Sequence, residues 1–397
     1  MAEVDADAAL TMYVNVGRVM EQIEELTKEL PAEKKEPADN VIKALGLSNF
    51  TQIAVTGSFS GAEWTDKSFV GLKGEERGGL ASLFAPKPID DAMLKWVPKE
   101  ATSFQVVRLD LPNLWDRLGE LMKAAGPEAV LEFKKATSQF RKQFGMDLRK
   151  DVLAGLDDTM LVYNLPSTDD AEAETLFMLK LRDEKKVLET LDAVLKKLEA
   201  EGSDIGVKKE KLAGVEATIA TVETKSAAWG AYKGWLVVST PDGFERAIKQ
   251  IKTGKKSILD NEKFAAARKS LGATGAAVSV DYHDPAALYG DFLKNAALLM
   301  IMANMAGAEL PGNFLPDADK VEKYLSPGAS VTWVDEKGSH CVSRSAMPGI
   351  SLMAGQFNGG PVMMVAGVAF SAAMVAGLVA PAAPEVMPEV PKMPDEP

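Results

Sequence analysis

The chain has 397 residues, of which 46% are hydrophobic and 26% are charged, so it has enough apolar material for two or three packed domains. A net charge of −12, without a block rich in Lys and Arg, argues against nucleic acid as a partner, because phosphate binding needs clustered cations. The single cysteine, Cys341, excludes an intrachain disulfide and a cysteine-rich metal site.

The N-terminus reads MAEVDADAAL, with acidic residues where a signal peptide carries basic ones and no apolar stretch of signal length. Either the chain is not exported or a signal has been removed from it.

A first α+β unit is expected over residues 1–88. It starts with the alternating strand TMYVNV and continues into an amphipathic helix whose apolar face carries Val19, Met20, Ile23, Leu26 and Leu30. A second, short helix follows at NVIKALGL. The strands FTQIAVTGSF and KSFVGLKG complete the unit.

Residues 89–256 repeat this order, with an insertion. The strand SFQVVRLD leads into a helix at LPNLWDRLGELM, and DTMLVYNL and AETLFMLKLRD supply a pair of strands. The insertion opens with a strongly amphipathic helix (Val187, Leu188, Leu191, Val194, Leu195, Leu198). It continues into strands around GVKKEKL, GVEATIATVE and GWLVVST, and the helix PDGFERAIKQI closes it.

A third unit is expected over residues 257–350. The strand in AAVSVDYHDP leads into an apolar helix to about Ala306, and the strands GASVTWVDE and SHCVSRSA follow. Helices that alternate with pairs of antiparallel strands predict an α+β fold, in which strand-helix-helix-strand-strand units form antiparallel sheets packed with helices. The similarity among the three units is weak and divergent.

One hydrophobic helix is expected near the C-terminus. No charged residue occurs from Ser345 to Pro384, and Pro361–Ala380 is an almost wholly apolar run of twenty residues. At a rise of about 1.5 Å per residue, such a helix spans roughly 30 Å of hydrocarbon. The prediction is a transmembrane helix at 361–380, followed by a Pro-rich acidic tail at 381–397. A buried core helix is the alternative.

Two segments carry a family resemblance: FGMDLRKDVLAGLDDTMLVY (144–163) and YKGWLVVSTPDGFERAIKQI (232–251). With openings of the kind VPKEATSFQVVRLDLPNLW, they resemble an uncharacterised bacterial extracytoplasmic family known only as a domain of unknown function, over roughly residues 5–346. The resemblance implies a secreted or membrane-anchored domain and supplies no catalytic residues.

Few residues are candidates for catalysis or metal binding. The two histidines, His283 and His340, have no metal-ligand spacing to another His, Cys or carboxylate. Neighbouring side chains on a strand point to opposite faces, so His340 and Cys341 are not expected to form a dyad. His283 is expected to serve a strand-to-helix corner beside Asp284. We therefore expect no catalytic residue, no metal and no cofactor.

An aromatic cluster is the best candidate for ligand binding. Trp229, Tyr232 and Trp235 lie in AWGAYKGWLVV, and aromatic faces stack well on sugars and apolar ligands. Their spacing of three requires a turn within the cluster. Packing in the core of a hairpin is the alternative.

The predicted function is a membrane-tethered extracytoplasmic binding or scaffold domain without catalytic activity. Its expected partners are membrane lipid, through residues 361–380, and a protein, a glycan or an apolar ligand. A carrier or chaperone for an apolar ligand such as lipid is the first alternative, and an enzyme of unknown class the second. The large domain is placed in the periplasm or at the cell surface. Lys337 and Arg344 before the span, and the acidic tail after it, favour the cytoplasmic side and leave that orientation open.

Overall fold

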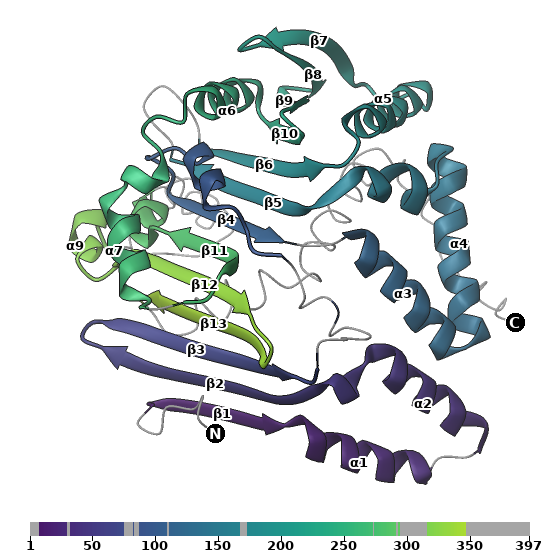
Figure 1. The fold of residues 1–397 in the computed structure, drawn as a ribbon. Coiled ribbons are helices and arrows are strands. Elements are labelled where there is room, and N and C mark those ends of the chain that lie inside the picture. Colours follow the sequence, from purple (N-terminus) through teal and green to yellow (C-terminus); the bar gives the residue numbers. More distant parts are fainter. Residues whose placement is uncertain are drawn as a thin grey trace, which may run out of the picture.

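A single antiparallel sheet of thirteen strands organises the protein in the computed structural model (Figure 1). The structure describes residues 8–29, 32–74, 82, 87–108, 111–166, 173–272, 274–290, 293 and 316–346. Across the sheet the strands run in the order β1-β2-β3-β13-β12-β11-β4-β5-β6-β10-β9-β8-β7. Strands that are neighbours in the sheet are also consecutive in the chain, except at three junctions: β3–β13, β11–β4 and β6–β10.

The strands are short to medium in length, and each pairs antiparallel with its neighbours. Their bounds are β1 Leu10–Asn15, β2 Phe50–Ser60, β3 Glu63–Leu72, β4 Ser103–Arg108, β5 Leu156–Leu165, β6 Glu174–Leu181, β7 Gly206–Leu212, β8 Val215–Val222, β9 Lys225–Tyr232, β10 Trp235–Ser239, β11 Ala277–His283, β12 Gly328–Val334 and β13 Gly338–Ser345.

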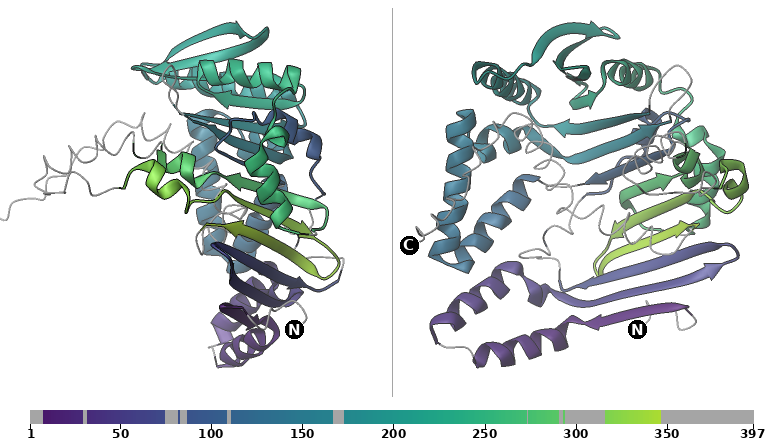
Figure 2. Two further views of the ribbon diagram at one scale, coloured as in Figure 1. Left: turned by 90° about the vertical axis from the view of Figure 1, so that its left-hand side faces the viewer. Right: turned by 180° about the vertical axis from the view of Figure 1, so that it is seen from behind.

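Helices lie at one end of the strands and on both faces of the sheet. The α-helices are α1 Val16–Lys28, α2 Ala32–Leu45, α3 Leu111–Ala125, α4 Pro127–Phe144, α5 Glu184–Ala200, α6 Pro241–Thr253, α7 Glu262–Ser270 and α9 Ala318–Glu322. Short helical turns occur at η1 Leu47–Asn49, η3 Asp91–Trp96, η4 Leu148–Val152, η5 Leu153–Gly155 and η6 Ile258–Asp260. In Figure 1, α1 to α4 extend beyond the sheet on the right, and Figure 2 shows α6 and α7 against one face.

Local sequence signals define α6. The Thr240 hydroxyl accepts a hydrogen bond from the Gly243 N–H at 3.1 Å, and Pro241 occupies the first turn, where no N–H is needed. Gly254 ends the helix in the left-handed conformation with φ of 58°, which glycine adopts without steric penalty. These signals set the two ends of α6, and its buried side chains, among them Phe244 and Ile248, pack it on the sheet.

The main core lies between the sheet and the helices α6 and α7. Its largest fully buried side chains come from strands and helices alike: Tyr163, Tyr282, Phe244, Phe264, Leu94, Leu161, Leu176, Met178, Ile248, Ile258, Val97 and Val106. A smaller cluster on the opposite face packs α5 on the sheet through Leu111, Leu156, Leu181, Val187 and Leu236. We call the first face the α6 face and the second the α5 face.

The predicted α+β class is confirmed, because helices pack on a large antiparallel sheet. The structure differs in joining the strands of all three predicted units into one sheet instead of several, since β3 pairs with β13 and β11 pairs with β4. Within each unit the first strand pairs with the second and the second with the third.

The two most apolar predicted helices lie mainly outside the described residues. The helix expected to reach Ala306 lies largely outside the described residues, and the expected membrane helix 361–380 lies wholly outside them. Within the described ranges, no helix combines the length and the apolar character needed to cross a membrane.

Candidate functional site

The aromatic hairpin consists of β9 and β10, joined by Lys233 and Gly234. Both turn residues have positive φ, 52° and 81°, as a two-residue hairpin turn requires. The turn sets Trp235 directly opposite Tyr232. Trp235 is 4% exposed on the α6 face, and its ring meets Trp96 edge to face at a centroid distance of 5.2 Å. Trp235 is therefore part of the main core.

The other two aromatic residues lie in different surroundings. Tyr232 borders the main core, and Lys233 and Lys252 place their Nζ atoms 5.4 and 5.7 Å from its ring centroid. Trp229 packs in the cluster on the α5 face, where its buried Nε1 has no hydrogen-bond partner among the described residues. The sheet thus separates Trp229 from Tyr232 and Trp235, and the three do not form one surface.

His340 and Cys341 point to opposite faces of β13, as the alternation of a strand demands. The imidazole stacks on Trp333 at a centroid distance of 5.1 Å and contacts Phe69 at 4.7 Å. Its Nε2 lies 3.0 Å from Asp335 Oδ2, and although burial raises the pKa of Asp335, the hydrogen bonds it receives lower that pKa overall. His340 therefore fastens the β12–β13 hairpin.

The Cys341 thiol lies on the α5 face, 6% exposed. Burial raises the pKa of this thiol to about 11, and hydrogen bonds with Thr332 and Ser68 offset only part of that shift. A thiol with so high a pKa is a poor nucleophile near neutral pH.

His283 ends β11 at the strand-to-helix corner. Burial lowers the pKa of its imidazole, which favours the neutral ring. The neighbouring Asp284 accepts from Lys263 Nζ at 2.8 Å and from the Ala287 N–H at 3.4 Å. Asp284 thus anchors the start of the following helix to α7.

A buried row of polar side chains, which was not predicted from the sequence, crosses the α5 face. Pairing places these residues directly opposite one another on five adjacent strands: Gln105, Asp281, Ser330, Ser343 and Asp66. Directly opposed residues share a face with Cβ atoms roughly 5 Å apart. Four of the five are between 1% and 6% exposed, and Gln105 is half-buried. We call these five residues the Asp281 row.

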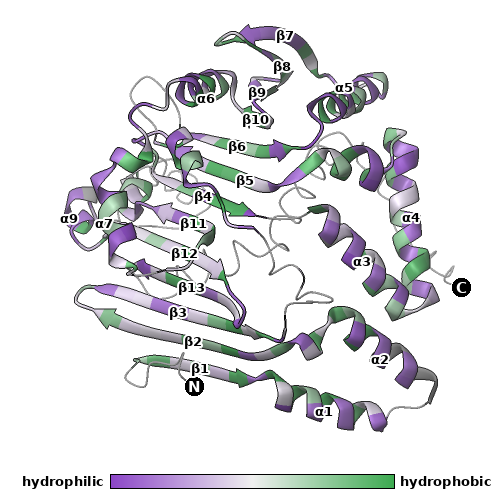
Figure 3. Ribbon diagram, in the orientation of Figure 1, coloured by the Kyte–Doolittle hydropathy of each residue, from purple (hydrophilic) through white to green (hydrophobic). Residues whose placement is uncertain are grey.

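A second row runs beside it, formed by Ser279, Thr332, Cys341 and Ser68. Figure 3 shows the corresponding difference in hydropathy, with β11 to β13 paler and more purple than β4 to β6. This part of the sheet therefore has an apolar α6 face and a buried polar α5 face.

Asp281 is the centre of the polar interior. Its Oδ1 accepts from Gln105 Nε2 at 2.5 Å, and its Oδ2 accepts from Ser330 Oγ at 3.0 Å and Ser279 Oγ at 3.1 Å. Burial raises the pKa of Asp281 to about 7, and these three hydrogen bonds offset only part of that effect. All three donors are neutral, so the site can take up or release one proton near neutral pH.

The sequence does carry a pattern that corresponds to this row, but such a pattern is usually taken to indicate a solvent-exposed face and not a buried one. Ser279, Asp281 and His283 alternate with apolar residues, and such a pattern commonly predicts a strand with one solvated face. The alternation correctly separates the two faces of β11. It cannot show that the polar face is buried, because that depends on what packs there.

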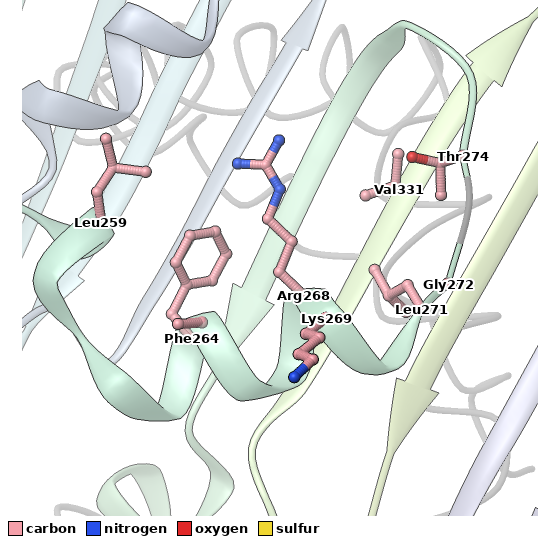
Figure 4. A pocket seen from close by; sticks show the side chains of 9 residues that line it. Leu259, Phe264, Arg268, Lys269, Leu271, Gly272, Thr274 and Val331 are labelled. Carbon is pink, nitrogen blue, oxygen red and sulfur yellow. The ribbon is translucent and has the colours of Figure 1, made fainter.

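No group of three or more His, Cys, Asp or Glu side chains is arranged to hold a metal ion in the described ranges. The α6 face does contain a cavity of about 390 Å³ beside α7 (Figure 4). Phe264, Leu271 and Val331 supply apolar walls, and Arg268 and Lys269 leave the helix in different directions. Arg268 is held by Asp91 at 2.8 Å.

Comparison with solved structures gives only distant similarity. Crystal form IV of TP0453 has a TM-score of 0.27 and 13% sequence identity over 68% of this chain and 85% of that chain. Crystal form III has a TM-score of 0.25 and 14% identity over 63% and 76%. Similarity at this level is too low to transfer any property. No curated protein matches the chain.

Comparison with protein families gives a match to a family described as "Protein of unknown function (DUF3352)", over residues 11–278. This span begins within β1, ends within β11 and includes both segments on which the resemblance rested. The chain belongs to this DUF3352 family.

Proposed function

We propose that the chain is a binding or scaffold domain without catalytic activity, tethered to a membrane by residues 361–380 and placed on the extracytoplasmic side. The observation that carries the proposal is that its potentially reactive side chains are used in packing. His340 lies between two aromatic rings and beside Asp335, and the thiol of Cys341 has a pKa raised to about 11.

The place of β13 in the sheet also supports a scaffold. The last strand, β13, lies inside the sheet between β3 and β12, and its final residue, Ser345, pairs with Trp64 near the β2–β3 turn. A tether that follows β13 would hold the domain from an inner strand. The α1–α4 end of the molecule and the β1 edge of the sheet would remain available to partners.

The carrier for an apolar ligand has weaker support. A lipid-binding interior needs an apolar lining. On the α6 face the apolar side chains pack on α6 and α7, and the cavity beside α7 is lined by Arg268 and Lys269 as well as by apolar residues. On the α5 face the Asp281 row is polar. Neither arrangement favours an apolar ligand.

The three units are further proposed to be divergent copies of one strand-helix-helix-strand-strand unit. Equivalent pairing supports this: β1 with β2, β4 with β5 and β11 with β12, each followed by a hairpin. Each copy would thus contribute three strands to the scaffold.

Membrane association is tested by fractionating cells that express the full chain or a chain ending at Gly355. The full chain should stay with membranes after alkaline carbonate extraction, and the shortened chain should be released. Val368→Lys with Ala372→Lys should weaken retention, because each cation near the bilayer centre costs roughly 3 kcal/mol. Ala382→Lys with Ala383→Lys adds the same charge in the tail and serves as the control.

The side of the membrane is read from protease added to intact spheroplasts. Digestion of the large domain supports the extracytoplasmic placement, and protection until lysis contradicts it. A full chain that carbonate releases completely would contradict the tether.

A further inference from the structure

The two edges of the sheet differ in how they are protected. At one edge, β7 carries Lys208, Lys209, Glu210 and Lys211, all exposed. Lys209 Nζ reaches Asp192 at 2.7 Å and Lys208 Nζ reaches Glu210 at 2.9 Å. Charged residues, especially lysines, on an edge strand discourage another strand from pairing with it. The β7 edge is therefore protected.

The other edge, β1, lacks these devices. Its sequence, LTMYVN, contains no charge and no proline, and its six pairs with β2 run without a register shift. No described strand pairs with the outer side of β1, so alternate backbone N–H and C=O groups on that side can accept a further strand.

Large apolar side chains are exposed along β1. Leu10 is 47% exposed, Met12 49% and Tyr13 44%. Leu10, Met12 and Val14 share one face of the strand, because alternate residues do so. Phe59 of β2, which is 61% exposed, lies two residues beyond the partner of Leu10 on that face. The exposed backbone edge is thus flanked by an apolar strip.

We propose that β1 pairs antiparallel with β1 of a second copy of this chain, so that the sheets of the two copies become continuous. A two-fold axis perpendicular to the sheet keeps equivalent faces on the same side. Centred on Met12, it sets Met12 opposite itself and Leu10 opposite Val14 of the second copy. All three pairs on that face are then apolar.

The strand itself favours this occupant, because β1 is the edge where repulsion between two copies is smallest. Each copy carries a net charge of −12, so two copies repel each other across most orientations. Contact through Leu10–Asn15 sets no charged side chain directly against another, because the strand has none. In this register the apolar residues of one β1 lie opposite apolar residues of the other, so a second copy of the same strand is a suitable partner. The proposal does not depend on the membrane tether.

Disulfide trapping in the full chain tests the register. Met12→Cys would place two thiols on directly opposed residues with Cα atoms about 5 Å apart, within disulfide range. Lys211→Cys puts an exposed cysteine on the β7 edge as the matched control, and Cys341 stays buried in both. Under mild oxidation the first variant should form disulfide dimers at least about tenfold faster, because pairing raises the local thiol concentration.

The mass of the full chain provides a second readout, in detergent where the chain requires it. Met12→Lys should weaken the dimer at least about tenfold, because two like charges would lie directly opposite. Leu131→Lys on α4, at a side chain 52% exposed, is the control and should leave dimerisation unchanged. Urea midpoints close to the parent confirm that both variants fold.

Three results would overturn the proposal. The first is a Met12→Cys variant that cross-links no faster than Lys211→Cys. The second is a full chain that is monomeric at every concentration. The third is a dimer that Met12→Lys leaves unchanged. Cross-linking of Met12→Cys to a different protein alone would assign the edge to that protein and not to a second copy.

Discussion

Asp281 on β11 accepts a hydrogen bond of 2.5 Å from Gln105 on β4, which lies 176 positions earlier in the chain. The contact crosses the β11–β4 junction, where strands of the third and second predicted units meet. It belongs to a buried polar row and not to the apolar core. Stability at this junction should therefore depend on protonation as well as on packing.

The first prediction concerns the pH dependence of unfolding. The pKa of Asp281 is raised from 3.8 to about 7 in the folded chain. Between these values the folded chain holds a proton that the unfolded chain releases, so the stability from this carboxyl is complete below pH 4 and is lost as pH rises through 7. The loss is at most about 4 kcal/mol. Asp281→Asn should remove it.

Urea titrations at pH 5 and pH 8 measure this effect. The difference in unfolding free energy between the two pH values should be smaller in Asp281→Asn than in the parent. Asp204→Asn, at an exposed loop position, should keep the parental difference. Equal differences in all three proteins would show that Asp281 is ionised in the folded chain throughout this range.

Trp235→Ala should destabilise the domain by about 3–5 kcal/mol, because it removes a large buried ring and its contact with Trp96. Phe177→Ala on β6 is the control, since that ring is 46% exposed, and it should cost much less. Chemical denaturation gives both values. An unchanged denaturation midpoint for Trp235→Ala would show that the ring is not part of the core and would favour its role as an exposed ligand contact.

Cys341 should react slowly with a neutral thiol reagent in the native protein at pH 7. The thiol is buried and its pKa is raised to about 11, so reagent access and the thiolate fraction are both small. Denaturant should restore ordinary labelling in the same sample. Fast native labelling with a titration midpoint below the ordinary thiol value would instead indicate an activated nucleophile.

Gly234→Ala should weaken the aromatic hairpin by about 1–2 kcal/mol, because a residue with a Cβ is strained at a φ of 81°. Lys233→Gly at the preceding turn position, where φ is 52°, should be neutral or slightly stabilising. Thermal unfolding of the two variants compares the positions. Equal effects would mean that the turn does not require this backbone conformation.

Local sequence patterns predicted the individual elements well. Alternation identified β1, β4 and β11, and the spacing of Trp229, Tyr232 and Trp235 correctly required a turn. These features depend on residues close together in the chain. The pairing of β3 with β13 joins residues far apart in the chain. Local patterns do not predict it, because the backbone of one strand can form hydrogen bonds with many other strands.

The environment of each face was harder to predict. The alternation in β11 separated Asp281 from Val280, but burial of Asp281 depends on neighbouring strands and on what covers them. The aromatic hairpin shows the same problem, since Trp229 and Trp235 are close in sequence yet lie on opposite faces. Alternation along a strand therefore predicts which residues share a face, but not whether that face is buried or what packs on it.

The position of β13 also bears on how the chain folds during synthesis. β3 is made early, yet its second neighbour in the sheet is β13, the last described strand to leave the ribosome. Until then β3 is an unpaired edge, with residues such as Phe69 and Trp64 exposed to other nascent chains. Contacts so distant in sequence slow folding and prolong the time at risk of aggregation. Completion of the sheet should therefore wait until β13 has been made and has left the ribosome.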